Sequence, residues 1–397
     1  MMQSYDVVII GGGVIGSSIA CHLSTNPGFT GRVAVVERDP SYAAASSSHS
    51  TSAIRQQFAT AANIRMSGYS IAFLRRAQEL LGVDGHDASI SLHEPGYLIL
   101  GGPGDLPAFQ ARVAVQRACG ASTELLTPAE AGQRHPWLRV DDLGAASYGP
   151  EGEGWFDGPA LLQAFRRKAR AGGVEYIAGT VSGFEMAGAG PAGPRHADAV
   201  LLAGGGRVGA GTVVIAAGPW SGAVGRMAGL DVPVVPLKRC VFVFDSPERI
   251  PHSPFIFDTS GFIFRPEGHL YLCGTAPVVE NAPDDFGQEV DHALFEDRIW
   301  PALAHRIPGF ERLRLLRAWA GLYEHNLFDH SAILGRHPEV QNLVLACGFS
   351  GHGMMHSPAA GAGISELIIH GAARSVDLAP FAFERIAAGQ PIQEHVY

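Results

Sequence analysis

The sequence is poor in cysteine, in charged residues and in long apolar runs, and each scarcity excludes a class of protein. Its cysteines are odd in number and never form a C-x-x-C pair, so we expect neither a disulfide framework nor a zinc site. Charged residues make up 17% of the chain and the net charge is −9, which gives no electrostatic reason to bind nucleic acid. No apolar run approaches the roughly 20 residues of a membrane span. The five cysteines, expected to be reduced and buried thiols, are Cys21, Cys119, Cys240, Cys273 and Cys347.

Metal-binding and targeting signals are also lacking. The 17 histidines show no H-E-x-x-H or comparable spacing, so we expect no metal site. An apolar strand begins almost at Met1 and leaves no room for a cleaved signal peptide, which predicts a cytoplasmic protein. A chain of 397 residues is too long for one ordinary core and suits two domains.

The strongest pattern that is present lies between Tyr5 and Arg38. Residues 7–10 (VVII) form an apolar run of strand length, and the GxGxxG pattern of residues 11–16 (GGGVIG) follows at once. In such a strand-to-helix turn, Gly11 permits the tight bend, Gly13 admits a pyrophosphate and Gly16 lets the helix pack closely on the strand. The helix N-terminus then favours the negative charge of phosphates.

An acidic residue follows at the distance that a dinucleotide site requires. Residues 17–24 are expected to form the helix and residues 32–36 a second parallel strand, and Glu37 comes 21 residues after Gly16 (37 − 16). A carboxylate there accepts hydrogen bonds from ribose hydroxyls, and an acid in place of an arginine argues against NADP. The pattern alone does not choose between NAD and FAD, and a structural glycine turn is the alternative.

The rest of the chain alternates between segments in which helices follow strands and segments in which short strands dominate. Helices are expected at 63–81, 108–119, 158–171 and 360–370 and strands at 96–100, 174–182, 211–217 and 342–347, whereas short strands dominate from 232 to 322. A second glycine-rich strand-to-helix junction, GFSGHGMMHSP at 348–358, suggests that both junctions face one extended ligand. We therefore predict an α/β chain in which a Rossmann-like domain carries a second domain built on an antiparallel sheet. The expected segments are 1–84, 151–230 and 325–397 for the nucleotide-binding domain and 85–150 and 231–324 for the substrate domain.

Four ordered signatures together resemble the D-amino-acid oxidase superfamily, in its sarcosine oxidase, dimethylglycine oxidase and glycine oxidase branch. They are GGGVIG with Glu37, the serine-rich loop ASSSHSTSAIRQQF, the strand ending AAGPWS, and GFSGHGMM near the C-terminus. The resemblance covers nearly the full length and implies FAD, held between the nucleotide domain and an antiparallel substrate domain. It implies cofactor contacts from Gly11, Gly13, Val14, Gly16, Glu37, Arg38, Ser47, Ser48, His49, Val181, Ala217, Gly218, Trp220, Gly351, His352, Gly353 and Met354.

The resemblance also implies roles near the substrate. His49 occupies a loop similar to the one in which related dehydrogenases attach the flavin covalently, and the alternative is that His49 only hydrogen-bonds the flavin or substrate. Arg55 is a candidate clamp for a substrate carboxylate, because its guanidinium offers a bidentate fork, and the alternative is a pairing with a structural acid. His352 and Tyr323 complete the candidate catalytic set, and His269 and His325 are expected to border the substrate.

The sequence departs from the family pattern in three places: the first excludes flavin attachment through a cysteine, and the other two put sarcosine as substrate and oxygen as acceptor in doubt. Gly321 stands where some relatives attach the flavin through a cysteine. Met355 or His356 occupies the neighbourhood of a carboxylate-binding lysine. Tyr271 lies near the place of the lysine credited with oxygen activation.

The reaction that the resemblance implies is oxidation of a secondary or tertiary amine that carries a carboxylate, such as an N-alkylated amino acid. A hydride moves to flavin N5, the imine hydrolyses, and oxygen or another acceptor reoxidises the flavin. The alternatives are oxidation of a 2-hydroxy acid, and a non-catalytic flavoprotein that serves as a subunit or assembly factor.

Overall fold

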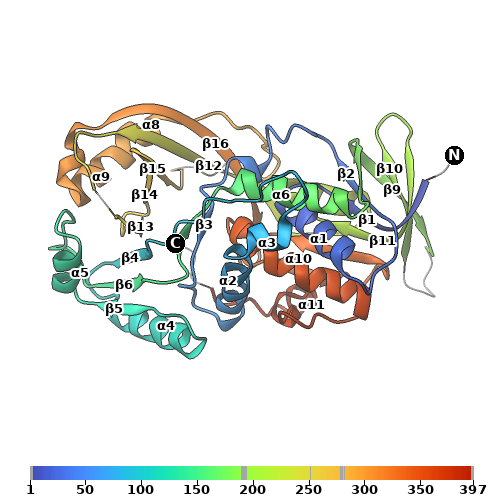
Figure 1. Cartoon of the computed structure of the whole chain (residues 1–397), viewed down its shortest axis with the longest axis horizontal. Coiled ribbons are helices and arrows are strands. Elements are labelled where there is room, and N and C mark those ends of the chain that lie inside the picture. The colour runs from blue at the N-terminus through green and yellow to red at the C-terminus, as the bar shows by residue number, and fades with distance from the viewer. Residues whose placement is uncertain (1–2, 189–194, 251, 278–279, 281, 395–397) are drawn as a thin grey trace.

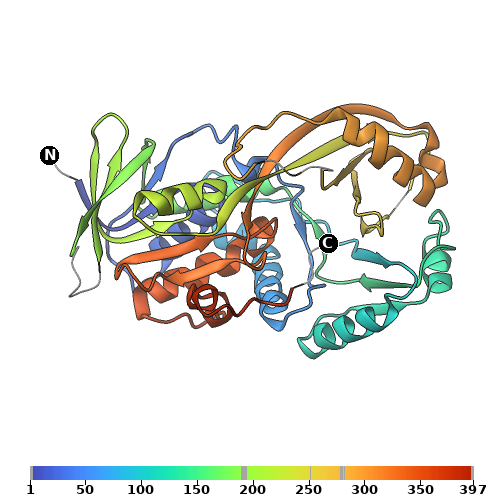
Figure 2. The ribbon, with the colours of Figure 1, turned by 180° about the vertical axis from the view of Figure 1, so that it is seen from behind.

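The computed structural model describes residues 3–188, 195–250, 252–277, 280 and 282–394. Two sheets form the opposite ends of an elongated molecule (Figures 1 and 2). The long strands β12 (Val234–Asp245) and β16 (Arg314–Asn326) belong to the second sheet and extend from it toward the first. Across the described part, no helix is both long enough and apolar enough to cross a lipid bilayer. All five cysteine thiols are free, and Cys119 alone among them is half-buried while the others are buried.

The first sheet is mostly parallel and has β1 (Gln3–Ile10) at its centre. Its strands follow the order β17-β18-β11-β1-β2-β8, with β10 paired to β11 and β9 paired to β10. Because β1 has parallel neighbours on both sides and its residues Val7 to Ile10 are buried, the expected buried strand is confirmed. The other strands are β2 (Val33–Glu37), β8 (Glu175–Ala178), β9 (Val181–Ala187), β10 (His196–Leu202), β11 (Arg207–Ile215), β17 (Ile333–Arg336) and β18 (Leu343–Cys347).

Helices cover one face of the first sheet and mixed elements cover the other. Alternate residues of β1 divide between two cores, so Val7 and Ile9 pack under the helices α1, α2, α6 and α10, whereas Val8 and Ile10 face β9, β10 and α7. The α-helices of both halves of the described chain are α1 (Val14–Thr25), α2 (Ala61–Leu74), α3 (Ala77–Leu81), α4 (Leu106–Ala118), α5 (Pro128–Arg134), α6 (Gly158–Ala171), α7 (Ser221–Met227), α8 (His292–Leu294), α9 (Trp300–Arg306), α10 (Gly353–His370) and α11 (Glu384–Ala387).

The second sheet is antiparallel except where β13 runs parallel to β4. Its order is β16-β12-β15-β14-β13-β4-β6-β5, so it joins strands from both of the segments expected to form the substrate domain. One of its faces packs a phenylalanine-rich core that includes Phe242, Phe244, Phe264 and Phe310 under α9. Its remaining strands are β4 (Tyr97–Gly101), β5 (Glu124–Leu126), β6 (Ala145–Gly149), β13 (Phe255–Phe257), β14 (Ile263–Glu267) and β15 (Leu270–Thr275). The exact residue limits of the two domains stay a prediction.

A small two-stranded sheet pairs β3 (Ala53–Ile54) with β7 (Gly154–Trp155) near the junction of the two halves. It ties the serine-rich loop, in which β3 lies, to the chain that returns from the second sheet.

Three of the expected elements are corrected by the structure. The single helix expected over 63–81 is two helices, because the chain leaves the α-helix at Arg75 and Arg76. The strand expected over 174–182 is divided at Gly179 and Thr180 between β8, which pairs with β2, and β9, which pairs with β10.

The third correction is that α10 begins at Gly353, well before the expected Ala360. Pro358, expected to precede the helix, lies inside it. Proline has no N–H to bond the carbonyl four residues earlier, which belongs to Met354. The Ser357 hydroxyl donates to that Met354 carbonyl at 2.9 Å, so the proline is tolerated and the helix N-terminus extends to Gly353.

Candidate functional site

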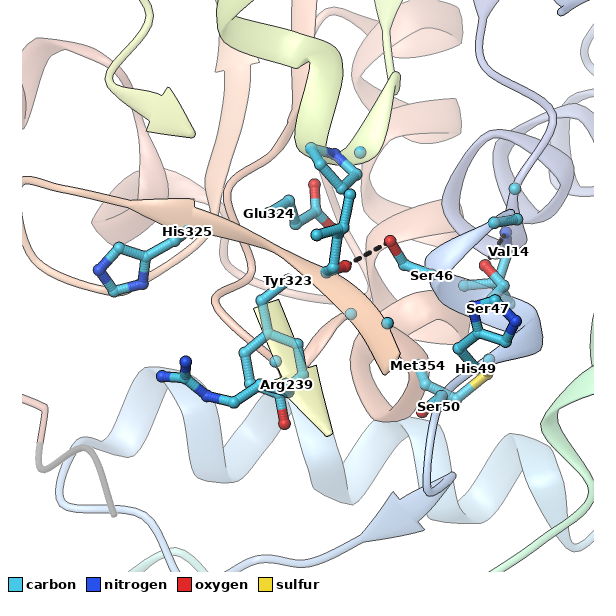
Figure 3. Close-up of a pocket in the computed structure, with 18 of the residues that line it drawn as sticks. Val14, Ser46, Ser47, His49, Ser50, Arg239, Tyr323, Glu324, His325 and Met354 are labelled. Atoms are coloured by element: carbon cyan, nitrogen blue, oxygen red, sulfur yellow. Dashed lines mark hydrogen bonds between the residues drawn. The ribbon is translucent and has the colours of Figure 1, made fainter. Parts of the chain in front are cut away.

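A cavity of about 500 Å³ lies between the two sheets and is lined by residues from both (Figure 3). Its walls include the C-terminal ends of β1, β2 and β11, the serine-rich loop, the second glycine-rich junction, and the inward face of β12 and β16. The structure brings these predicted residues to the cavity: Gly11, Gly13, Val14, Glu37, Arg38, Ser47, His49, Arg55, Val181, Ala217, Gly218, Trp220, Tyr323, Gly351, His352, Gly353 and Met354. Both glycine junctions therefore open onto the same cavity.

The first glycine junction is formed by backbone contacts that no side chain allows. Gly11 has φ +100°, and a Cβ there would lie 2.3 Å from the carbonyl oxygen of Ala216. A Cβ on Gly16 would lie 1.9 Å from the carbonyl oxygen of Gly11, so Gly16 lets α1 pack on β1, as expected, but it does not line the cavity. Gly13 caps the N-terminus of α1 and lies at the cavity wall, where the free N–H groups of the first turn favour a phosphate.

Glu37 ends β2 with its carboxylate held in place by backbone donors. One oxygen accepts from the N–H of Gly12 at 2.7 Å and the other accepts from the N–H of Asp39 at 2.8 Å. Each carboxylate oxygen keeps a further lone pair for a ribose hydroxyl. The guanidinium of Arg38 lies 3.5 Å from the centre of the Trp220 ring, so these two residues form one wall of the adenosine end.

The serine-rich loop bridges the two halves of the molecule. The Ser47 hydroxyl accepts from the N–H of Val14 at 3.0 Å, and the Ser46 hydroxyl donates to the carbonyl of Leu322 in β16 at 2.5 Å (Figure 3). Ser48 is a correction, because it does not line the cavity whereas Ser46 does. The short 3₁₀ turn over Ser46–Ser48 is the reason, since neighbouring residues of such a turn project in different directions.

His49 lines the cavity beside β16. Its Nδ1 is buried and has no hydrogen-bond partner within the described part of the chain, and burial lowers the pKa of its imidazole. Its carbonyl accepts from the indole of Trp319 at 3.0 Å. A Cβ on Gly321 would lie 2.8 Å from the Cβ of His49, so the glycine that replaces a family cysteine makes room for this histidine. A neutral imidazole with an unsatisfied nitrogen suits a site that a ligand completes.

Arg55 is a buried cation at the cavity wall. Its side chain lies over the Phe58 ring at 4.5 Å, and Nη2 donates to Nε2 of His352 at 3.1 Å. The arginine always donates, so Nε2 of His352 accepts and the proton of the neutral ring sits on Nδ1. Burial, followed by the charge of Arg55, lowers the pKa of His352 well below its ordinary value. The structure thus joins Arg55 and His352, which were predicted separately.

The second glycine junction places the N-terminus of α10 against the cavity. Gly351 has φ +97°, and a Cβ there would lie 2.6 Å from the ring of Tyr323, which lines the same wall. Gly353 is the first residue of α10 and Met354 follows it. Free N–H groups at this helix start favour negative charge on a bound group, as they do at α1.

His269, expected to border the substrate, and Tyr271, expected near the place of the oxygen-activating lysine of relatives, both lie outside the cavity. Tyr271 is buried in the phenylalanine-rich core, where its hydroxyl accepts from the N–H of Ile250 and donates to the carbonyl of Glu248. His269 is exposed, and neither residue lines the cavity. His269 lies in the turn before β15, and only the far end of β15, at Gly274 and Thr275, reaches the cavity.

His325 lines the cavity as expected, and its ring stacks on that of His330 with centroids 4.7 Å apart. Burial, then the charges of His330 and Arg239, lowers the pKa of His325 to about 4. His356, in contrast, is fully enclosed and hydrogen-bonds the Ser67 hydroxyl at 3.0 Å, and its pKa is lowered to about 3, chiefly by burial.

Two polar residues of the site escaped the sequence reasoning. Arg239 of β12 lies over the Tyr323 ring at 5.3 Å and lines the cavity, and Glu324 lines it next to the start of α10 (Figure 3). The available signal was a lone glutamate in a strand-like run, AGLYEHN, since a charged side chain within a buried strand needs a partner or a function. The described residues contain no group of three or more His, Cys, Asp or Glu side chains able to hold a metal ion.

These features fit a flavin dinucleotide. The glycine cradle and the α1 N-terminus suit a pyrophosphate, Glu37 suits a ribose, and the unsatisfied His49 nitrogen and the α10 N-terminus suit a polar ring system at the far end. The cavity extends without interruption from one end to the other.

Comparison with known proteins decides the family. The family model described as "FAD dependent oxidoreductase" (DAO) matches residues 6–367. The chain belongs to this family. FAD-dependent oxidoreductase domain-containing protein 1 of Xenopus laevis is 40% identical to it, over 98% of this chain and 84% of the relative. The resemblance, the fold class and FAD as cofactor are thereby confirmed for this FAD-dependent oxidoreductase.

Solved structures of two enzymes share the fold over nearly the whole chain. L-proline dehydrogenase from P. horikoshii superposes with a TM-score of 0.86 at 26% identity, covering 99% of this chain and all of its own. Glycine oxidase from Geobacillus kaustophilus superposes with a TM-score of 0.79 at 26% identity, covering 96% of this chain and 98% of its own.

Proposed function

We propose that this oxidoreductase oxidises the C–N bond of a secondary or tertiary amine that carries a carboxylate, an N-alkylated amino acid in the simplest case. The observation that carries the proposal is Arg55, a buried guanidinium that opens onto the cavity and is oriented by His352. The names of the two structural neighbours, L-proline dehydrogenase and glycine oxidase, support an amino acid as substrate, and proline is itself a secondary amine.

Arg55 supplies the binding energy and the orientation. Its planar guanidinium matches a carboxylate with two parallel hydrogen bonds, and Phe58 and His352 restrict its rotation. The substrate amine then lies in a partly desolvated cavity that already contains the charges of Arg55 and Arg239. Nearby positive charge lowers the pKa of the amine, so the neutral form that the reaction requires is favoured.

Bound FAD supplies the acceptor for the hydride that leaves the carbon next to nitrogen. An amine that is already neutral needs no protein base for this step. A 2-hydroxy acid, in contrast, loses its hydroxyl proton together with the hydride and needs a nearby base. The lining histidines His49, His325 and His352 all have lowered pKa values, which makes them weak bases and favours the amine.

A matched pair of substrates tests the proposal. We expect anaerobic mixing with L-proline, sarcosine or dimethylglycine to bleach the flavin absorbance for at least one of these compounds. The same amine without its carboxylate, pyrrolidine in place of proline, is expected to reduce the flavin at least tenfold less efficiently. If no amine bleaches a flavin that dithionite reduces, the proposal is wrong. Bleaching by lactate or glycolate alone would establish the hydroxy-acid alternative, and no bleaching together with a stably bound partner protein would establish the non-catalytic one.

We further infer that His49 contacts the flavin. Its neutral imidazole and unsatisfied Nδ1 permit either a hydrogen bond to the cofactor or a covalent bond to its 8α-methyl group. Acid precipitation separates the two roles. Yellow colour in the supernatant with an unchanged protein mass leaves the hydrogen bond, and colour in the pellet with a heavier peptide containing His49 establishes the covalent bond. If His49→Ala binds FAD as tightly as the unchanged protein, the contact itself is refuted.

A further inference from the structure

Glu324 is a carboxyl group in the wall of the FAD cavity with no part in the mechanism above. One of its oxygens, Oε2, accepts from the N–H of Gly348 at 3.0 Å, and the backbone carbonyl accepts from the N–H of Ser350. Its other oxygen, Oε1, faces the first residue of α10, where a Cβ on Gly353 would lie 3.1 Å away. Figure 3 shows Glu324 beside Tyr323, on the strand that forms the cavity wall.

The position of Glu324 corresponds to the flavin ring end of the cavity. Gly13 and Glu37 would hold the pyrophosphate and ribose of FAD at the opposite end, so the isoalloxazine would lie at the end lined by Gly351, Gly353 and Glu324. Reduced flavin carries a negative charge on its pyrimidine side, and the α10 N-terminus suits that charge. An ionised carboxylate at the same helix start would repel it.

The surroundings of Glu324 favour its protonated form. Burial raises its pKa to about 8, and the hydrogen bond from Gly348 offsets only part of this shift. The neighbouring titratable groups do not supply a counter-charge. Cys347 on β18 is a buried thiol with a raised pKa, whereas His325 on β16 and His352 at the start of α10 are held neutral by burial. Arg239 of β12 lies across the Tyr323 ring and is engaged with Glu280.

We propose that Glu324 is a redox-linked proton acceptor of this enzyme: in alkaline solution it is ionised beside the oxidised flavin and takes up one proton when the flavin is reduced. The substrate gives up a hydride, which is two electrons and one proton, and the flavin gains one negative charge. In alkaline solution, where Glu324 is ionised while the flavin is oxidised, its carboxylate binds one proton from solvent in the same step, so the charge at this end of the cavity does not change. Reoxidation by the electron acceptor releases that proton again.

The alternative is a purely structural role, in which Glu324 only holds the Gly348–Ser350 turn in place. Glu324→Gln separates the two roles, because the amide oxygen of glutamine still accepts from Gly348 but cannot ionise. Glu324→Asp provides the complementary variant, which can ionise but is shorter. The proposal rests on FAD binding and not on the identity of the substrate, so failure of the proposed amine oxidation leaves it testable.

The experiment is a reduction of the FAD-loaded protein with xanthine and xanthine oxidase against a reference dye, repeated from about pH 6 to about pH 10. The slope of the two-electron potential with pH counts the protons taken up. Above pH 8 we expect the unchanged protein to take up one more proton per two electrons than Glu324→Gln, and we expect Glu324→Asp to restore part of the difference. Equal slopes in two folded, FAD-loaded proteins would overturn the proposal.

A second measurement needs no variant and therefore covers the case in which Glu324→Gln does not fold. Redox-difference infrared spectroscopy of the unchanged protein at about pH 9 is expected to show a protonated carboxyl band that appears on reduction and disappears on reoxidation. Absence of such a band would also overturn the proposal. Labelling of glutamate with carbon-13 would identify the band as that of a glutamate.

Discussion

Replacement of Arg55 by lysine is the sharpest test of how this enzyme recognises its substrate. Arg55 is 5% exposed, lies 4.5 Å over the Phe58 ring, and donates to His352 at 3.1 Å. Lysine keeps the positive charge and much of the length, but it presents a single point donor in place of a planar fork. The variant therefore removes geometry and leaves charge.

The magnitude follows from the hydrogen bonds that are lost. A carboxylate held by two parallel bonds from a guanidinium loses at least one charge-assisted bond, which is worth about 1.5–3 kcal/mol. That corresponds to a loss of about 10- to 150-fold in affinity. A lysine ammonium at this position can keep part of the hydrogen bond to His352 and of the contact with Phe58. We therefore expect the loss of affinity to lie in the lower half of this range.

The assay is a titration with a carboxylate that cannot react, such as 2-furoate, followed by the change in the flavin absorbance spectrum. Arg76→Lys is the matched control, since Arg76, which precedes α3, pairs with Glu79 of that helix and more than half of each side chain is exposed. The control is expected to bind like the unchanged protein. If Arg55→Lys also does so while retaining FAD, Arg55 is a structural arginine and the clamp does not exist.

Two further changes follow from the geometry. Gly351→Ala is expected to weaken FAD binding by at least about tenfold, because a Cβ would lie 2.6 Å from the Tyr323 ring. Flavin fluorescence on dilution measures the loss, and Gly104→Ala, which has the same φ of +97° but open space around it, should leave FAD binding unchanged. Glu153→Gln is expected to change the pH dependence of folding, because burial raises the pKa of Glu153 from 4.5 to about 7. The contribution of protonated Glu153 to the unfolding free energy is full below pH 4.5 and is lost as the pH rises through 7. Between pH 4.5 and pH 8 the unchanged protein should therefore lose ~3 kcal/mol more unfolding free energy than the variant. Urea titrations measure both losses, and equal losses would contradict the prediction.

The parts of this enzyme that sequence predicts are those in which local spacing determines structure. Gly11, Gly13 and Glu37 belong to one strand–helix–strand unit, so their distances along the chain fix their distances in space. The start of α5 is equally local, because Thr127 and Glu130 form a reciprocal cap that is visible as a four-residue pattern. The wall made by Gly351 and Gly353 was predicted for the same reason.

The parts that sequence missed depend on which strands pair and which faces point inward. Arg239 reaches the cavity because β12 pairs with β16 in a register that sets it opposite Gly321. The residue spacing within β12 or β16 does not predict how the two strands pair. Glu324 carried a local signal, a charge within a strand-like run, but only the pairing of β16 shows that it faces the cavity. Tyr271 lies outside the site because only the far end of β15, at Gly274 and Thr275, reaches the cavity. The charged residues of the site, Arg239 and Glu324, thus owe their positions in the cavity to contacts between segments far apart in the sequence.

The serine-rich loop has a consequence for the protein without its cofactor. Ser46 is bonded to Leu322, His49 accepts from Trp319, and Ser47 is bonded to Val14, so one short segment fastens both ends of the molecule to each other along the edge of the FAD cavity. Val14, Ser46, Ser47, His49 and Leu322 all line the cavity, so a dinucleotide bound there is expected to stabilise the folded state in which these bonds form. The protein without FAD is therefore expected to be more susceptible to proteolysis than the FAD-loaded protein.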